Sequence, residues 1–372
     1  MENPVSTISR PVNRRSFMKT GLLAGGAATI GAGFLGNARS AQARELSPTG
    51  ALESGDVAIL QFLAAAELIE SDLWIQYAEL GGIGKDKPIE VNPNPNPPLN
   101  AYQLALSNLD GDGPQYITSN TLDEVSHANF LNAYLRSQGA AEVNFDRFRT
   151  LPGSTAKGST GIKRLTNLMH LNVDTSWFVR YRSATNPDFG VTYPQAVTIT
   201  NRTAIPRTNA DFADADHIQV IANTAAFHFG TIEQGGTSLY AAMSQKVRSA
   251  EVLQITLGIG GDEIAHFLEW VDFAGNAVQA PIAPVSDSGL TFPNLFSPLN
   301  PLLQPSLIFP VPCEFINPTL PHVSVIRPIT SDFGGAMAAA QGFIADGLFV
   351  GQSQEFIDLL LDLAYDADQA SR

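Results

Sequence analysis

Cysteine and charged residues are the scarcest features of this 372-residue sequence. Its single cysteine, Cys313, excludes both an intramolecular disulfide and a metal site built from several thiolates. Charged residues make up 16% of the chain, and Asp and Glu (36) outnumber Lys and Arg (22), which gives a formal net charge of −14 at pH 7. This acidity argues against nucleic acid and anionic membrane surfaces as partners. Because the sequence has only one cysteine, any metal must be bound through oxygen and nitrogen, which suits iron or manganese.

Several common functional patterns are also missing. The sequence has no Gly-rich phosphate loop, no zinc-finger spacing and no nucleophile elbow. An apolar run at 20–36 is 17 residues long and includes six glycines. That run is too short and too weakly apolar for a good transmembrane helix. We therefore expect no stable membrane span in the mature chain.

The N-terminus carries features of a targeting segment. Arg14 and Arg15 precede the apolar run, and an Ala-Gln-Ala sequence that ends at Ala43 offers small residues for cleavage. Together these features resemble a twin-arginine secretion signal, a pathway that exports proteins already folded. The resemblance implies that residues 1–43 are a signal peptide and that the protein is exported to a periplasmic or extracellular location.

Apolar periodicity predicts four long helices in the remaining chain. A proline-rich loop at 82–100 separates the first two, and the region at about 146–210 forms an insertion between the second and the third. In the first helix, Asp72 and Glu79 are expected on the solvated side. The four predicted helices are Asp56–Leu80, Pro114–Gln138, Asp211–Gln245 and Ser249–Ala274.

The insertion and the C-terminal part are less regular. Within the insertion, Ile162–Arg182 is predicted to be helical, and Gly190–Thr200 has strand-like residues that suggest a hairpin arm. Residues 276–372 are predicted to form a coil-rich, proline-rich extension, followed by an amphipathic terminal helix at Glu355–Ala370. That helix docks either on the chain's own helices or on another subunit, so a homo-oligomer is one of two expectations.

The stretch Leu257–Trp270 contains the most informative motif, a Glu-x-x-His sequence in an apolar helical pattern. A second copy lies upstream, and each copy is preceded by a helix with a glutamate on its apolar face. At a spacing of three residues, Glu and His project from the same side of a helix. This order is typical of a two-metal site inside a four-helix bundle, where four carboxylates offset two divalent cations. The candidate metal ligands are Glu67, Glu124, His127, Glu233, Glu263 and His266.

Some of these assignments leave alternatives open. Glu70 lies three residues after Glu67 and shares its side of the helix in part. His228 lies five residues before Glu233 and therefore off the ligand face, which favours a structural role. Gly230, Gly235 and Gly236 each cost about 1 kcal/mol relative to alanine in a helix. Three such residues near Glu233 suggest either a close approach of helices or room for a ligand.

With these motifs, the sequence resembles the ferritin-like superfamily, most closely its secreted or desiccation-related branch. The resemblance covers about 55–145 and 212–275. It implies a mainly α fold, a ferritin-like four-helix bundle at 44–275, and two iron ions, two manganese ions or a mixed pair. The long insertion and the extension depart from the compact pattern and put a storage cage in doubt.

The resemblance also implies residues around the metals. Trp74 and Tyr240 each follow a single glutamate by seven residues, where the superfamily often has an aromatic residue; plain core packing is the alternative. Asp123 and Asp262 each precede a Glu-x-x-His copy, and internal symmetry pairs Asp123 with His266 and Asp262 with His127. Such aspartates fix the histidine tautomer. Ordinary surface charge is the alternative for both.

Two functions follow as expectations. The first is an exported metal protein that reacts with oxygen or peroxide, an oxidoreductase of the di-iron type. The second is a non-enzymatic stress or envelope protein that uses the helices as a scaffold, with the metal as a structural support. Oxygen-dependent turnover after metal loading distinguishes the two.

Overall fold

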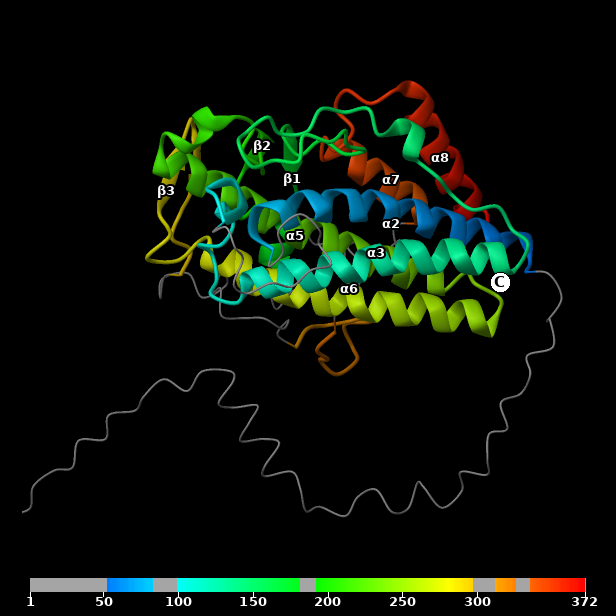
Figure 1. Ribbon diagram of the computed structural model, residues 1–372. Coiled ribbons are helices and arrows are strands. Elements are labelled where there is room, and N and C mark those ends of the chain that lie inside the picture. Colours follow the sequence, from blue (N-terminus) through cyan, green and yellow to red (C-terminus); the bar gives the residue numbers. More distant parts are fainter. Residues whose placement is uncertain (1–51, 83–98, 181–191, 297–311, 326–334, 372) are drawn as a thin grey trace, which may run out of the picture. The chain divides into compact units, whose positions relative to one another are not determined.

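Four long helices lie side by side and form the central part of the described chain (Figure 1). In this computed structural model, α2 packs along α3 and α5 packs along α6. Each helix begins and ends within four residues of the limits predicted from the sequence, and the mainly α fold class is confirmed. The helices are α2 (Ser54–Gly81), α3 (Gly113–Ser137), α5 (Ala215–Ser244) and α6 (Ala250–Asn276).

The structure describes residues 52–82, 99–180, 192–296, 312–325 and 335–371. All of them belong to one unit of the chain, Ala51–Arg372. The expected signal segment lies outside the described residues, as does almost all of the proline-rich loop.

Side chains at the starts of the helices explain where they begin. The carboxylate of Asp214 and the hydroxyl of Ser249 accept hydrogen bonds from backbone N–H groups in the first turns of α5 and α6. Such a cap is worth about 1 kcal/mol. In α2 the carboxylate of Asp56 instead accepts from the backbone N–H groups of Arg248 (2.9 Å) and Ser249 (2.8 Å). This contact ties the start of α6 to the start of α2.

A cluster of aromatic side chains fills the core between α2, α5 and α6. The ring of Trp74 stacks on that of Phe229 with centroids 4.8 Å apart, and Phe229 stacks on Trp270 at 4.2 Å. All three side chains are fully buried. Gly230 is required nearby because a Cβ atom at this position would lie 2.3 Å from the ring of Trp177. This close approach accounts for one of the three costly glycines of α5.

The insertion is mostly not helical, so the helix predicted at Ile162–Arg182 is wrong over most of its length. The described part of the stretch 162–182 contains the strand β1 (Leu171–Val173) and a single short helix, α4 (Ser176–Arg180). Strand β1 pairs antiparallel with β2 (Ile199–Arg202), which overlaps the end of the strand-like stretch. Short 3-10 turns, η2 (Asp146–Phe148) and η4 (Asn209–Phe212), flank these elements.

Long-range hydrogen bonds explain the loss of that helix. The backbone N–H groups of Arg164, Asn167 and Asn172 donate to the carbonyl groups of Leu151, Leu348 and Asp346, at 2.7–2.9 Å. A backbone N–H group that bonds to a distant carbonyl is not available for the helical ladder. The C-terminal part of the chain therefore decides the conformation of the insertion.

Asp72 and Glu79 are not on a solvated side of α2, contrary to the prediction. Asp72 is 2% exposed, and its Oδ2 atom accepts hydrogen bonds from the backbone N–H groups of Leu165 (3.1 Å) and Thr166 (2.9 Å). Its other oxygen pairs with the guanidinium of Arg149. Glu79 forms an ion pair with Arg164. Both carboxylates therefore fasten the insertion to α2.

The C-terminal extension contains more regular structure than predicted. Its described part holds a hairpin of β3 (Val285–Asp287) and β4 (Leu290–Phe292), and the helices α7 (Ala336–Ala345) and α8 (Gln354–Asp368). Helix α8 matches the predicted terminal helix, whereas α7 was not predicted. Helix α8 packs on α2 of its own chain and on α7, and α7 also contacts α5 (Figure 1).

Asp368 at the end of α8 holds α7 in place. Its carboxylate accepts from the backbone N–H groups of Ala336 and Met337, both at 2.9 Å, and pairs with Lys246 at 2.8 Å. These contacts supply the partners that the N-terminus of α7 needs. The start of α7 is thereby fixed to α8 and to the end of α5.

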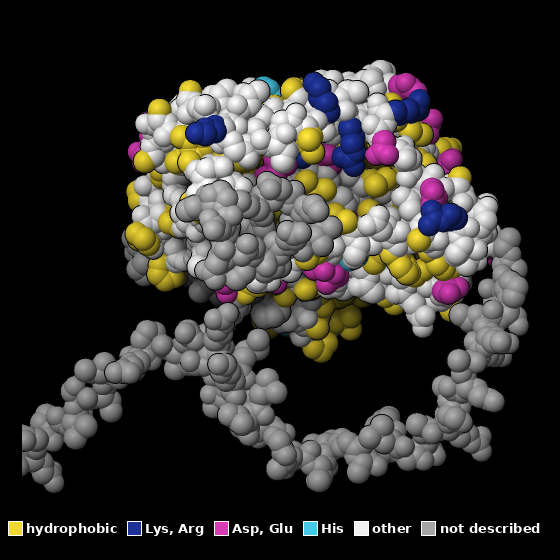
Figure 2. Space-filling model, viewed as in Figure 1, with side chains coloured by type: hydrophobic (Ala, Val, Ile, Leu, Met, Phe, Trp, Pro, Cys, Tyr) yellow, Lys and Arg dark blue, Asp and Glu magenta, His cyan; other side chains and the backbone are white. Residues whose placement is uncertain are grey.

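The surface shows no sign of a broad basic region on the face drawn in Figure 2, where Lys and Arg side chains lie singly or in small groups, several beside Asp or Glu. Among the described residues, no helix combines the length and the apolar character that crossing a membrane requires.

We predict that Asp72→Ala lowers the free energy of unfolding by about 3 kcal/mol, because it leaves buried N–H groups of the insertion and the Arg149 charge without their acceptor. Urea unfolding followed by circular dichroism measures the change. Asp362→Ala, an exposed aspartate of α8, is the control and should change stability by less than about 0.5 kcal/mol. Equal effects of the two substitutions would contradict the role given to Asp72.

Candidate metal centre

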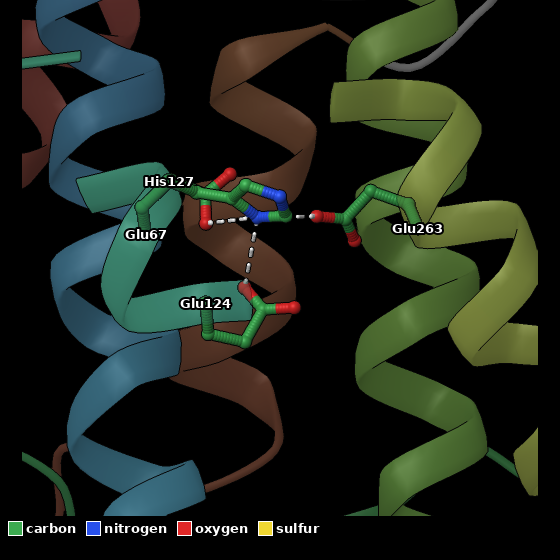
Figure 3. A group of neighbouring side chains, drawn as sticks. All are labelled: Glu67, Glu124, His127 and Glu263. Carbon is green, nitrogen blue, oxygen red and sulfur yellow. Dashed lines mark ion pairs between the residues drawn. The ribbon is translucent and has the colours of Figure 1, made fainter. Parts of the chain in front are cut away.

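The structure brings all six candidate ligands together in the interior between the four long helices. Helices α2 and α5 each provide one glutamate, and α3 and α6 each provide a Glu-x-x-His pair, as Figure 3 shows for four of these residues. The carboxylates are at most 1% exposed, and the two histidines are 7% and 2% exposed. The six residues are Glu67, Glu124, His127, Glu233, Glu263 and His266.

The ligand atoms fall into two groups that can each hold a metal ion. One group consists of Glu67, Glu124, His127 and Glu263, and its atoms lie within 4.8 Å of one another. In it, the Nδ1 atom of His127 is 3.4 Å from Glu67 Oε2 and 3.6 Å from Glu124 Oε2. Glu263 Oε1 lies 4.0 Å from the same nitrogen (Figure 3).

The second group consists of Glu124, Glu233 and His266. The Nδ1 atom of His266 is 3.0 Å from Glu124 Oε1 and 3.3 Å from Glu233 Oε2. Glu124 belongs to both groups, with one carboxylate oxygen towards each histidine. It is therefore placed to bridge two ions, as a shared carboxylate does in two-metal sites.

The outer nitrogen of each histidine faces an aspartate from the neighbouring helix. The Nε2 atom of His127 is 3.1 Å from Asp262 Oδ2, and that of His266 is 3.3 Å from Asp123 Oδ2. This is the crosswise pairing expected from the sequence symmetry. When Nδ1 binds a metal ion, an aspartate at Nε2 would hold the remaining proton there and fix the orientation of the ring. The aspartate side chains are 43% exposed and mark the outer edge of the site.

The unpaired atoms of the cluster fit a metal. Seven carboxylate oxygens and both inward histidine nitrogens are buried and have no hydrogen-bond partner in the described part of the chain. Buried polar atoms are ordinarily paired. Carboxylate oxygens and imidazole nitrogens are donors that bind metal ions in proteins. The unpaired atoms are Oε2 of Glu67, Nδ1 of His127 and His266, and both carboxylate oxygens of Glu124, Glu233 and Glu263.

The pKa values of the four glutamates reflect their burial and their closeness to one another. Burial and the charge of Glu124 raise the pKa of Glu67 to about 8, and burial raises the pKa of Glu233 to about 7. Burial and four neighbouring carboxylates raise the pKa of Glu263 well above its usual range. Burial also opposes ionisation of Glu124, but the contacts with His127 and His266 lower its pKa to about 2. In the metal-free protein the cluster therefore keeps protons on several carboxyl groups, and a bound cation would displace them.

The two aromatic residues expected near the metals have different surroundings. The hydroxyl of Tyr240 donates a hydrogen bond to Glu67 Oε1. Tyr240 therefore orients a candidate ligand from α5. Trp74 packs in the aromatic cluster on Phe229 and Trp270. Its surroundings are those of a core residue.

Sequence reasoning left one carboxylate of this region undecided. Glu70 is 3% exposed and lies one helical turn after Glu67. Burial, followed by the charge of Glu124, raises the pKa of Glu70 well above its usual range, and Glu67 and Glu233 add to this effect. Glu70 does not belong to either ligand group. Its spacing to Glu67 signalled an inward position, but nothing in the sequence showed what it faces.

His228 has the structural role that its spacing favoured. Its Nδ1 atom lies 2.7 Å from the hydroxyl of Tyr77, and burial lowers the pKa of His228 to about 3. The side chain is therefore neutral and hydrogen-bonded in the core. Two further histidines also have side-chain partners. His170 bonds to Asn201, and His217 lies between Asp211 and Asp287.

The remaining glycines of α5 explain how the helices fit around the carboxylates. A Cβ atom at Gly236 would lie 1.9 Å from Glu263 Oε2. Only glycine therefore lets this carboxylate reach its observed position. A Cβ atom at Gly235 would meet no described atom within 4 Å. The two alternatives drawn from the sequence are both realised, a close approach at Gly236 and open space at Gly235.

We predict that metal-free protein becomes less stable as pH rises from about 5 to 8. The usual pKa of a glutamate is 4.5, whereas those of Glu67 and Glu233 are raised to about 8 and 7 in the fold. In this window the folded state binds more protons than the unfolded chain, so the free energy of unfolding falls with pH by up to about 1.4 kcal/mol per unit for each proton. His127, with its pKa raised to about 11, adds to the loss above pH 6.5.

Urea unfolding after chelation, at pH 5.5 and at pH 8, measures this dependence. Glu67→Gln should make the dependence shallower, because the amide does not titrate. An unfolding midpoint of the metal-free protein that rises with pH would contradict the prediction.

The chain was also compared with family models, with curated proteins and with solved structures, and none of the three comparisons gives a match. What the site can do therefore follows from its own residues and geometry.

Proposed function

We propose that this chain is an exported ferritin-like protein whose four long helices hold two iron or manganese ions that react with dioxygen or peroxide. One observation carries the proposal: six buried Glu and His side chains converge from four helices, and the atoms that face one another are unpaired. Four buried carboxylates without compensating cations would be very costly. Two divalent ions remove that cost.

The geometry suggests which residues hold each ion. Glu67, His127 and Glu263 surround one position, and Glu233 and His266 the other, with Glu124 shared. Bound there, the two ions supply the electrons for reduction of dioxygen or peroxide. A site that needs one glutamate from each of two helices and a Glu-x-x-His pair from each of two others is that of ferritin-like two-metal proteins.

Residues of the chain tune this site without being ligands. Asp123 and Asp262 hold protons on the outer histidine nitrogens, and Tyr240 fixes the orientation of Glu67 through its hydroxyl. The aromatic cluster next to the site excludes bulk water, which strengthens the attraction between the ligands and a bound cation.

The N-terminal pattern supports export in the proposed scheme. A twin-arginine signal at residues 1–43 would send out the protein already folded, with its metal acquired inside the cell. The single cysteine excludes an intramolecular disulfide even in an oxidising location, so the metal would supply the cross-link between helices.

We expect native protein purified after export to contain about two iron or manganese ions per chain. The double variant Glu124→Ala/Glu263→Ala should lose both ions, because it removes the shared carboxylate and a second ligand. Metal analysis by mass spectrometry gives the content. Asp262→Asn should bind metal about 10- to 100-fold more weakly, since it loses the partner of His127.

Glu251→Ala is the matched control for metal content, because Glu251 is a carboxylate at the far N-terminal end of α6. It should keep the full amount. Folded wild-type protein that contains no metal and takes up neither iron nor manganese would refute the two-metal site.

Turnover separates the proposed oxidoreductase from the scaffold alternative. Metal-loaded wild-type protein should consume dioxygen or peroxide in the presence of a reductant, and the double variant should lose this activity by at least about 100-fold. An oxygen electrode and a peroxide assay measure the two rates. Protein that keeps two ions and reacts with neither oxidant would instead support a stress or envelope protein with a structural metal.

A further inference from the structure

A cavity of about 230 Å³ lies directly beside the candidate metal centre. Four parts of the chain line it: Glu70 of α2, α5, the segment at Asp174–Trp177 in the insertion, and α7 in the C-terminal extension. Apolar side chains of the last three parts contribute to its wall. These are Trp177, Ile232, Leu239, Ala338, Ala339 and Phe343.

The cavity and the metal centre share one wall. Gly236 lines the cavity, and the carboxylate of Glu263 lies against its Cα, where a Cβ atom would be 1.9 Å from Oε2. Glu70 also lines the cavity and lies one turn along α2 from Glu67. A molecule in the cavity would therefore be separated from the ligand carboxylates by little more than a glycine backbone.

The size of the cavity exceeds what dioxygen or peroxide needs. One water molecule occupies about 30 Å³ in the liquid, and an apolar cavity of about 150 Å³ in another protein binds benzene. A volume of about 230 Å³ accepts a molecule the size of benzene with one small substituent. The cavity thus suits a small organic ligand.

The charged groups of the wall are all acidic. Glu70, Asp174 and Asp346 line the cavity, and no Lys, Arg or His is among the described residues that line it. Glu70 is 3% exposed, and burial, followed by the charge of Glu124, raises the pKa of its carboxyl group well above the usual range. Burial and the nearby Asp174 raise the pKa of Asp346 to about 8. Ionising a buried carboxyl group is costly, and a cationic ligand offsets that cost.

We propose that this cavity binds a small organic amine whose apolar part lies between Trp177 and Phe343 and whose ammonium group lies against Glu70. Aromatic faces attract organic cations, which adds to the attraction by the carboxyl groups. A carboxylic acid or a phosphorylated molecule would instead add to the cost of ionising these groups. Binding of the amine does not require the metals. Only the statement that the bound amine lies beside two metal ions rests on the proposed function.

This assignment gives the C-terminal extension a role. Ala338, Ala339, Gly342 and Phe343 of α7 form the side of the cavity opposite α5. Asp368 fixes α7 in that position through the backbone of Ala336 and Met337. The extension therefore closes a ligand site that the four long helices alone would leave open.

Three probes of nearly equal shape and different charge test the proposal: benzylamine, benzyl alcohol and benzoate. Isothermal titration of the purified full chain with each probe gives the affinities, and metal content is measured on the same samples. We expect benzylamine to bind about tenfold or more tightly than benzoate, with the alcohol between them. Glu70→Gln should remove most of the preference for the amine over the alcohol.

Two variants that fill the cavity provide the structural test. A Cβ atom at Gly235 of α5 or at Gly342 of α7 meets no described atom within 4 Å, and both residues line the cavity. Gly235→Leu and Gly342→Leu should each weaken benzylamine binding by about tenfold or more without loss of metal. Because the two act from opposite sides, one remains informative if the other fails to fold.

Gly258→Leu is the matched control. Gly258 lies on the exposed side of α6, and a Cβ atom there also meets no described atom within 4 Å. It should leave the affinity for benzylamine unchanged. Equal affinities for the three probes, no binding of any probe, or binding that both cavity-filling variants leave intact would overturn the proposal. Slower iron(II) uptake in Gly235→Leu, with no probe bound, would identify the cavity as an access route for metal instead.

Discussion

The mutual repulsion of buried carboxylates between the four long helices is the constraint on which the rest of the structure depends. Glu67, Glu124, Glu233 and Glu263 are each at most 1% exposed, and two histidines are the only bases among them in the described cluster. Desolvation strengthens this repulsion, since charges interact more strongly at low dielectric. The apolar and aromatic core must offset that cost when no cation is bound, and metal ions bound in the proposed site would turn the same carboxylates into cross-links between the helices.

Many neighbouring residues are explained by this requirement. Gly236 makes room for the carboxylate of Glu263, and Tyr240 donates to Glu67. At the outer edge, Asp123 and Asp262 connect α3 and α6 crosswise through the histidines. The atoms that face the centre of the cluster, including Nδ1 of both histidines, therefore have no hydrogen-bond partner among the described residues. The outward Nε2 atom of each histidine, in contrast, has an aspartate partner.

The sequence correctly predicted the elements that depend on helical periodicity. It did not predict the conformation of segments whose backbone bonds to residues far away in the sequence. The four long helices and the convergence of the Glu-x-x-His pairs follow from spacings of three and four residues. The insertion was different, because its backbone bonds to Asp72 and to the segment at Asp346–Leu348 in place of a helical ladder. Helix α7 is rich in Ala and Gly and has little amphipathic pattern, so only its packing on α5 and α8 reveals it.

The position of Glu70 shows why the last step towards function needs the assembled fold. On α2 alone, Glu67 and Glu70 are equivalent inward carboxylates, one turn apart. The partner helices make them different: Glu67 meets His127 and Tyr240, whereas Glu70 meets a cavity closed by α7. Two glutamates of one helix are thereby directed to a metal centre and to the space beside it. Because α7 is held by α8, and α8 packs on α2, the C-terminal part of the chain fixes the wall of the cavity that Glu70 faces.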